Sequence, residues 1–140
     1  MHPRNSPHIF LPAGNEWADR FGYSRAVKIG PHVAMAGVVA IDNDGTTTSP
    51  DHAGRQATRC YEIVHAALRR LGLDKRAVVR SRAFVTDISR AAEVGDAHAA
   101  FFKQHKPCLT MVEVSRLVRD DLVVEIEIDA IDPEPFARGD

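Results

Sequence analysis

Three carboxylates near the C-terminal end of the chain are spaced so that they could act together. In the segment LVVEIEID, residues 122–129, Glu125, Glu127 and Asp129 alternate with apolar residues. A β-strand has a period of two, so the carboxylates share one face of a predicted strand and the apolar residues share the other. A carboxylate that loses hydration on such a face has a raised pKa unless an arginine offsets the effect. It can then act as a general acid or base near neutral pH.

Two arginines are predicted to face these carboxylates from a second strand. In the segment 77–87, alternation separates the set Arg80, Arg82, Phe84 and Thr86 from the set Val79, Ser81, Ala83 and Val85. If helices cover the apolar faces, Arg80 and Arg82 are the counter-charges for Glu125 and Glu127. Cross-strand pairs of this kind contribute roughly 0.2–1 kcal/mol each when exposed.

The carboxylate-bearing face has two interpretations, a solvated surface and a subunit interface, and the apolar residues expected there help to choose between them. Many two-layer sandwiches leave one sheet face in water, and a charged face agrees with that. Phe84, Met111, Leu122 and either Met35 or Ala36 are nevertheless expected on or near this face. Exposed apolar patches usually mark contacts, so we favour a subunit interface over a solvated face.

The rest of the sequence indicates the elements that must carry these residues. Periods of two and 3.6 predict the order β-β-α-β-α-β-β, in which Asp51 caps the first helix and Gly72 ends it. The first two strands are expected to pair antiparallel, and Asp44-Gly45 suits a hairpin-type turn. The predicted strands are 23–30, 32–42, 77–87, 108–117 and one within 119–131, and the predicted helices are 51–71 and 90–104. Several strands with two helices on one face form an α+β sandwich.

The first 20 residues show no period and are rich in Pro, Asn and His. They are predicted to form an irregular arm that docks through Phe10, Leu11 and Trp17. Trp17 and Phe21 are expected to anchor this arm, with a lid over a cleft as a second interpretation.

The composition of the chain argues against several classes of function. The chain has 140 residues, 44% of them apolar, and 18 basic against 19 acidic residues give a net charge of -1. That balance argues against binding to nucleic acid, because no basic excess is available. No apolar run approaches the roughly 18 residues of a membrane span, and the N-terminus lacks the uninterrupted apolar run of a signal peptide, so a cytoplasmic protein without membrane contact is expected. The two cysteines and seven histidines lack metal-ligand spacing, so two free thiols and no metal site are predicted.

Seven stretches in order resemble the Rid family (RidA, formerly YjgF). They are YSRAVKIG, VAMAGVVAIDNDGT, RQATRCYEIVHAALRRLGL, VVRSRAFVTDI, EVGDAHAAFFKQH, PCLTMVEVSRL and LVVEIEIDA. The resemblance implies a chorismate-mutase-like two-layer fold with a mixed sheet. It also implies a homotrimer whose sheets surround a central β-barrel, with a small-molecule cleft between each pair of subunits. The expected organisation is an arm at 1–21, a Rid-like domain at 22–132 and a polar tail at 133–140.

The resemblance also implies a chemistry. Active members hydrolyse reactive imines and enamines, such as 2-aminoacrylate, to keto acids and ammonia without a metal or organic cofactor. A glutamate of their last strand positions or activates the attacking water, and it corresponds to Glu125. A first-strand tyrosine corresponds to Tyr23, and the residue before the strand-two glycine, Gly37, corresponds to Ala36.

The substrate-binding arginine of the active members has no counterpart in this chain. Leu109 stands at its position, Thr110 replaces a serine, Met111 replaces a cysteine, and Gly95 replaces the usual asparagine of the second helix. Loss of a bidentate carboxylate contact costs on the order of 2–5 kcal/mol in transition-state binding, about 10²- to 10³-fold or more. Altered specificity, binding without turnover, or a substitute cation are the alternatives.

The substitute cation is hypothesised to be Arg25 or Arg82. His98, in the second helix, is interpreted either as a proton shuttle at the cleft or as a packing residue. Glu125 is left open between a functional carboxylate and a structural ion pair, whereas Glu127 and Asp129 are interpreted as interface or surface charges.

Two functions follow from these residues. The first is hydrolysis of a C=N bond, in which Glu125 orients water and Tyr23 and Thr110 offer hydroxyl groups. The second is a non-catalytic, metabolite-binding or chaperone-like trimer. The endoribonuclease label attached to relatives finds little support in the balanced charge.

Overall fold

Strand β6, which carries the alternating carboxylates, lies inside a six-stranded mixed sheet. The computed structural model describes residues 8–133, and the sheet order is β1-β2-β3-β6-β4-β5. All neighbouring strands are antiparallel except β4 and β5, which are parallel. The strands are β1 (Ile9–Leu11), β2 (Ala26–Ile29), β3 (His32–Val39), β4 (Val78–Val85), β5 (Cys108–Glu113) and β6 (Val124–Ile131).

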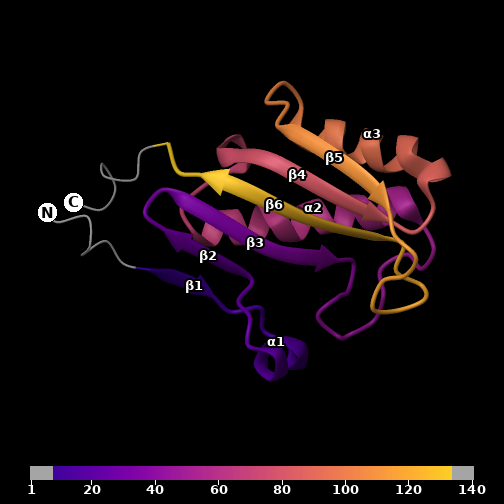
Figure 1. The fold of residues 1–140 in the computed structure, drawn as a ribbon, viewed down its shortest axis with the longest axis horizontal. Coiled ribbons are helices and arrows are strands. Elements are labelled where there is room, and N and C mark those ends of the chain that lie inside the picture. Colours follow the sequence, from indigo (N-terminus) through magenta and orange to yellow (C-terminus); the bar gives the residue numbers. More distant parts are fainter. Residues whose placement is uncertain (1–7, 134–140) are drawn as a thin grey trace, which may run out of the picture.

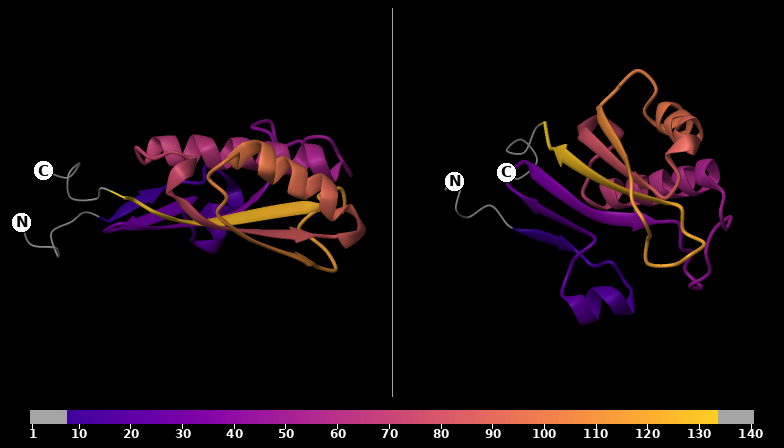
Figure 2. Two further views of the ribbon diagram at one scale, coloured as in Figure 1. Left: turned by 90° about the horizontal axis from the view of Figure 1, so that it is seen from above. Right: turned by 45° about the vertical axis from the view of Figure 1, so that its right-hand side comes forward.

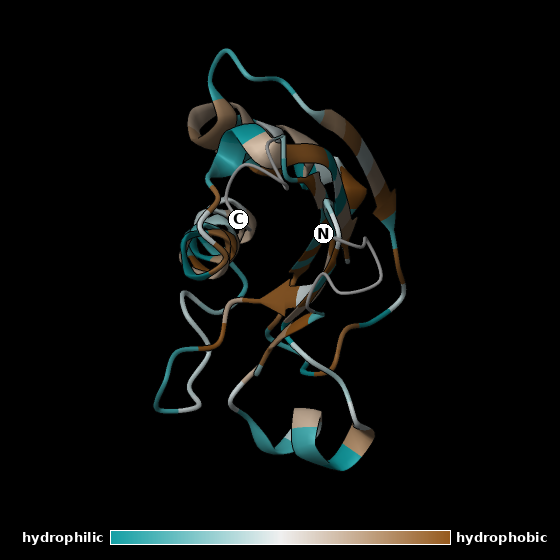
Figure 3. Cartoon of the chain, turned by 90° about the vertical axis from the view of Figure 1, so that its left-hand side faces the viewer, coloured by the Kyte–Doolittle hydropathy of each residue, from teal (hydrophilic) through white to brown (hydrophobic). Residues whose placement is uncertain are grey.

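Helices α2 (Ala53–Arg70) and α3 (Ala91–Phe102) cover one face of this sheet and leave the other open (Figures 1 and 2). The α2 side chains that repeat at helical spacing are buried, among them Cys60, Tyr61 and Val64, because an amphipathic helix turns its apolar stripe to the core. Strands and α2 each show hydrophobic and hydrophilic residues along their length, as expected of elements with one buried face (Figure 3). The predicted α+β architecture with two helices on one face is confirmed.

The start of α2 differs from the prediction. The helix begins at Ala53 after His52, and no side chain caps it. Asp51 instead has a φ of 63° and accepts a hydrogen bond from Arg90 at its backbone oxygen. A residue in this left-handed conformation lies outside the helix, so the Asp51 cap was wrong. Gly72 does end the helix, with a φ of 73°.

The N-terminal region contains regular structure that the sequence did not indicate. Residues 9–11 form β1 at the sheet edge, and a short helix, α1 (Glu16–Phe21), lies beyond that edge, apart from the two layers (Figures 1 and 3). Of the three residues expected to dock this segment, only Leu11 is buried, while Phe10 and Trp17 are exposed. Strands of three residues and helices of six are too short to show a period.

Two β-bulges change which side chains reach the open face. Between Val78 and Arg80 the pairing of β4 with β6 shifts by one residue, so Val79 is exposed instead of buried. A second shift lies in β3 between Met35 and Val38. Met35 is buried in the core on the helix side, which leaves Ala36 toward the open face. Leu122, which was expected near the open face, is fully buried.

The remaining predictions concern the cysteines, a membrane span and the two ends of the chain. Cys60 and Cys108 are both free thiols. Among residues 8–133 no helix combines the length and apolarity needed to cross a bilayer. Residues 134–140 of the predicted tail and residues 1–7 of the predicted arm lie outside the described residues.

Candidate functional site

The middle of the open face is an ion-pair cluster. Arg82 Nη1 lies 3.1 Å from Asp129 Oδ2 and 3.4 Å from Glu127 Oε1. Arg80 Nε lies 3.8 Å from Asp129 Oδ2. The predicted pairing of Arg82 with Glu127 is confirmed. These charges neutralise one another, so the cluster is structural in character.

The surroundings of Glu125 differ from those of Glu127 and Asp129. Its register partners are Val39 and Phe84, so no arginine stands directly across from it. Within residues 8–133 it takes part in no salt bridge, and the predicted pairing with Arg80 or Arg82 was wrong. Burial raises the pKa of Glu125 above its usual value, and Glu127 adds to the rise, while Arg25 opposes it.

The β3 bulge makes room for the Glu125 carboxylate. A Cβ atom built on Gly37 would overlap that carboxylate, so any other residue at this position would displace the Glu125 side chain. Without a side chain at Gly37, the carboxylate can lie directly against the backbone of β3. The bulge therefore accommodates the Glu125 carboxylate, and we call the space over Gly37 the carboxylate seat.

Arg25 is fixed beside this seat by its backbone and its side chain. Its Nη1 donates a hydrogen bond to the Gly37 oxygen at 3.2 Å, and its backbone oxygen accepts one from the Ala36 nitrogen at 2.9 Å. Burial lowers the pKa of Arg25, and the neighbouring Tyr23 and Glu125 oppose that change. Tyr23, Arg25, Ala36, Gly37 and Glu125, all predicted site residues, are therefore brought together in one chain.

Cys60 lies beneath the same bulge. Its Sγ donates a hydrogen bond to the Val38 oxygen at 3.3 Å, and burial raises the thiol pKa to about 12. A thiol with that pKa stays protonated near neutral pH and is a poor nucleophile. Cys60 is therefore a packing residue beneath the bulge.

The β5 candidates are placed elsewhere in the same chain. Leu109 and Met111 are in register with Ser81 and Ala83, which are buried on the helix-covered face, so they point to that side. Thr110 is in register with Arg82 and points to the open face. Strand β4 separates β5 from β6, so none of the three adjoins Glu125 within one subunit.

His98 also lies on the helix side of the sheet. It is only 8% exposed and its ring packs at 4.6 Å from Phe102 and 5.7 Å from Tyr61, measured between centroids. Among the described residues, its Nε2 has no hydrogen-bond partner. Burial lowers the pKa of His98, so its neutral form is favoured. This placement agrees with the packing interpretation for a single chain.

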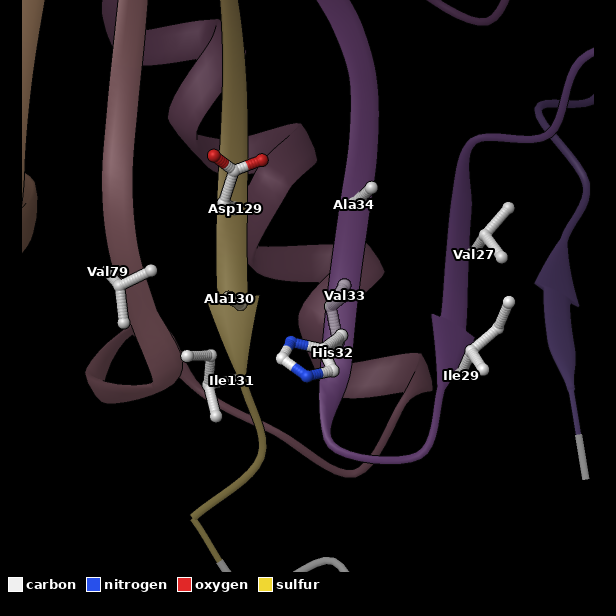
Figure 4. Close-up of a pocket in the computed structure, with 9 residues that line it drawn as sticks. All are labelled: Val27, Ile29, His32, Val33, Ala34, Val79, Asp129, Ala130 and Ile131. Carbon is white, nitrogen blue, oxygen red and sulfur yellow. The ribbon is translucent and has the colours of Figure 1, made fainter. Parts of the chain in front are cut away.

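An apolar hollow occupies the other end of the open face. It has a volume of about 360 Å³, and Asp129 and His32 are its two titratable residues (Figure 4). Its lining residues are Val27, Ile29, His32, Val33, Ala34, Val79, Asp129, Ala130 and Ile131. Asp129 lies four positions after Glu125 on β6, and a strand rises about 3.3 Å per position. The hollow therefore lies some 13 Å from the Glu125 carboxylate.

Comparison with known proteins identifies the family. The model of the family described as endoribonuclease L-PSP matches residues 14–132. This chain belongs to the Rid (YjgF) family. A 2-iminobutanoate/2-iminopropanoate deaminase of Salmonella typhimurium is 33% identical over 112 residues, which cover 78% of this chain and 84% of that protein.

A second relative and a solved structure extend this result. A RutC family protein of Pyrococcus abyssi is 31% identical over 109 residues, covering 78% of this chain and 84% of its own. Among solved structures, Rv2704 of Mycobacterium tuberculosis, described as a member of the YjgF/YER057c/UK114 family, matches with a TM-score of 0.81 and 39% identity. That match covers 89% of this chain and 99% of the other. The mixed sheet with helices on one face is thus the fold of this Rid-family member.

Proposed function

We propose that this Rid-family chain hydrolyses the C=N bond of a reactive imine or enamine metabolite, with Glu125 as the group that activates water. The observation that carries the proposal is the contrast along β6. Glu127 and Asp129 are neutralised by arginines, whereas Glu125 is desolvated, has no salt bridge within residues 8–133 and sits beside Arg25. The deaminase named among the relatives supports the same chemistry.

The proposed reaction needs one carboxylate and one water molecule. The water oxygen bonds to the imine carbon while Glu125 accepts a water proton, the π electrons of the C=N bond move to nitrogen, and Glu125 passes that proton to the nitrogen. In the resulting amino alcohol Glu125 accepts the hydroxyl proton and delivers it to the amino nitrogen, the C–N bond breaks with its electron pair on nitrogen, and ammonia leaves a ketone behind. A raised pKa makes Glu125 a better base and a competent acid for these transfers.

Arg25 is proposed as the substitute for the missing family arginine. Its guanidinium lies at the Gly37 seat, where it can bind a carboxylate or polarise the developing charge. Arg82 is the weaker candidate, because its Nη1 is already engaged with Glu127 and Asp129. Leu109 on β5 then narrows the choice of substrate instead of abolishing its binding.

The open face is proposed as the contact between three copies, arranged around a central barrel in a chorismate-mutase-like assembly. Exposed apolar residues support this: Ile29 is 47% exposed, and Val79 and Ile131 are each 42% exposed around the hollow. Such a patch is better satisfied by another protein surface than by water. Because β5 is the edge strand, both of its faces can border the cleft in that assembly, so a neighbouring copy would supply Thr110 from one face and Leu109 and Met111 from the other.

A non-catalytic, metabolite-binding trimer is the second candidate. It is favoured by Leu109 alone, since an apolar side chain there cannot fix a substrate carboxylate. The two candidates share the seat at Gly37 and differ in whether Glu125 turns over the bound molecule.

Release of keto acid separates these candidates. The protein is incubated with 2-iminopropanoate generated by an amino-acid oxidase, and with bulkier imines made in the same way. We expect Glu125→Gln to lower the rate by about 10²- to 10⁴-fold. The matched control, Glu127→Gln on the same face, is expected to stay within about threefold, with its mass in solution checked. No acceleration with any imine, together with bound ligand, would favour the binding protein.

A further inference from the structure

A glutamine near the start of α2 is fully buried although the proposed reaction gives it no part. Gln56 is 0% exposed, whereas glutamine is a residue type found mostly at protein surfaces. Burying an amide is costly unless its polar groups are hydrogen-bonded. The partners of the Gln56 amide therefore show what its burial achieves.

Gln56 uses both ends of its side-chain amide to bind backbone groups. Its Nε2 donates hydrogen bonds to the backbone oxygens of Asp121 at 2.8 Å and Ser49 at 3.2 Å. Its Oε1 accepts a hydrogen bond from the Val123 nitrogen at 2.9 Å. One side chain thus joins two segments that are far apart in the sequence, the loop that follows β3 and the loop that precedes β6.

These two loops adjoin the carboxylate seat. Strand β3 ends and strand β6 begins at the same end of the sheet, and Val39 of β3 is the register partner of Glu125 (Figure 1). Val123, whose nitrogen is bound by Gln56, comes two residues before Glu125. Its oxygen accepts a hydrogen bond from the Thr86 nitrogen at 3.1 Å. The chain is therefore held through both polar groups of Val123 just before it reaches Glu125.

The same side of α2 also contacts the bulge of β3. One turn beyond Gln56, Cys60 Sγ donates its hydrogen bond to the Val38 oxygen. Glu125 contributes to the raised pKa of the Cys60 thiol, so this part of α2 lies within electrostatic reach of the carboxylate. Residues four apart lie on one face of a helix. A single stripe of α2 therefore binds the start of β6 through Gln56 and the β3 bulge through Cys60.

We propose that Gln56 is a positioning residue, whose side-chain amide fixes the segment that enters β6 and so sets where the Glu125 carboxylate lies over Gly37. The inference rests on the proposed function, in which Glu125 exchanges protons with the attacking water. A general base must lie within hydrogen-bond distance of its water, and small displacements lower the rate strongly. Gln56 acts through the backbone of Val123 and does not touch the substrate.

Gln56→Met tests the proposal in kinetics with 2-iminopropanoate, because methionine has a similar length and forms none of the three hydrogen bonds. We expect kcat to fall by about tenfold while KM stays within about twofold, since the carboxylate is displaced and the groups that bind the substrate are not. Gln56→Glu keeps an acceptor for the Val123 nitrogen and should recover part of the loss.

The matched control is Leu68→Ala, about three turns further along the same helix. It removes a fully buried side chain and should lower the stability to denaturant at least as much as Gln56→Met does. Because Leu68 is distant from both loops, kcat should stay within about twofold. The comparison separates positioning of Glu125 from a general loss of stability.

The carboxyl pKa of Glu125, measured by NMR in the intact protein, is a second readout that needs no turnover. We expect Gln56→Met to move this pKa toward the ordinary glutamate value, because a displaced carboxylate is better hydrated. Leu68→Ala should leave the pKa unchanged. If Gln56→Met does not fold, Gln56→Glu is measured in its place, and an unchanged kcat together with an unchanged Glu125 pKa would overturn the proposal.

The outcomes distinguish this proposal from the proposed function. If the unaltered chain hydrolyses no imine but Gln56→Met shifts the Glu125 pKa and Leu68→Ala does not, the proposed function fails and the placement of Glu125 by Gln56 stands. If imines are hydrolysed and Gln56→Met matches Leu68→Ala in both kcat and the Glu125 pKa, Gln56 only stabilises the fold. The positioning role is then overturned and the proposed function stands.

Discussion

The two ends of strand β6 carry the same kind of side chain and use it in opposite ways. Toward its C-terminal end, Glu127 and Asp129 are bound by arginines of β4. At its N-terminal end, Glu125 lies over the glycine of a bulge with only a partly buried arginine nearby. Alternation alone makes the three carboxylates equivalent. The neighbouring strands make them different, because arginines stand across from two of them and an aromatic ring stands across from the third.

The largest effect is expected from filling the seat. Gly37→Ala places a methyl group where the Glu125 carboxylate lies, so it should lower imine hydrolysis by about 10²-fold or more. The overlapping atoms are the end of a flexible side chain that can swing away, so the free energy of unfolding should change by less than about 1 kcal/mol. Denaturant unfolding and the keto-acid assay measure the two effects.

The control for this change is Gly54→Ala in α2. A Cβ at Gly54 would make ordinary contact with Glu93 Cβ at 3.4 Å, and helix propensity favours alanine by about 0.5–1 kcal/mol. If the Gly37 and Gly54 variants hydrolyse imines at the same rate, the space at Gly37 is not needed for the reaction and the two ends of β6 are not distinguished.

A smaller loss is expected when the cation at the seat is removed. Arg25→Met deletes the guanidinium beside Glu125 and should lower kcat/KM for imines by about 10- to 100-fold. Arg25→Lys should recover only part of this, since an ammonium lacks the planar fork. Arg80→Met, which removes a half-buried arginine beside Asp129 at the other end of β6, should change kcat/KM by less than about threefold. A larger effect at Arg80 than at Arg25 would show that the cation used in hydrolysis lies beside Asp129 and not beside Glu125.

The smallest effect is a pH dependence of stability that arises on the helix side. Burial holds the pKa of His98 below its ordinary value of 6.5, so the unfolded chain takes up a proton before the folded one does. Stability should therefore be lost as pH falls from about 6.5 toward the lowered pKa, and be fully present above 6.5. His98→Phe should flatten this part of the stability-against-pH curve without altering the pH profile of imine hydrolysis. A matching shift in the hydrolysis profile would return His98 to the reaction.

Much of the fold could be predicted because it depends on local periodicity. The alternation around Ile126 and Ile128 gave the buried face of β6, and the 3.6-residue spacing around Tyr61 gave α2. The segments α1 and β1 escaped because they are too short for a period to show. Val79 was misplaced because a bulge depends on how two strands meet and leaves no mark in the alternation.

The candidate residues could be named from the sequence, whereas their positions relative to one another could not. Tyr23, Arg25 and Glu125 were named from the sequence, but which arginine meets which carboxylate depends on strand register. The sides taken by Leu109 and His98 follow from the position of β5 at the sheet edge and of α3 above the sheet. Those are relations between distant segments, which no single stretch of sequence contains.

The most direct test of the account is the titration of the Glu125 carboxyl carbon by NMR, assigned with the Glu125→Gln variant. We predict a pKa above the ordinary glutamate value of 4.5, because burial outweighs the attraction of Arg25. Arg25→Met should move the pKa further upward, since it removes the positive charge that lowers it. A Glu125 pKa at or below 4.5 would contradict the proposal that this half-buried carboxylate exchanges protons with the attacking water.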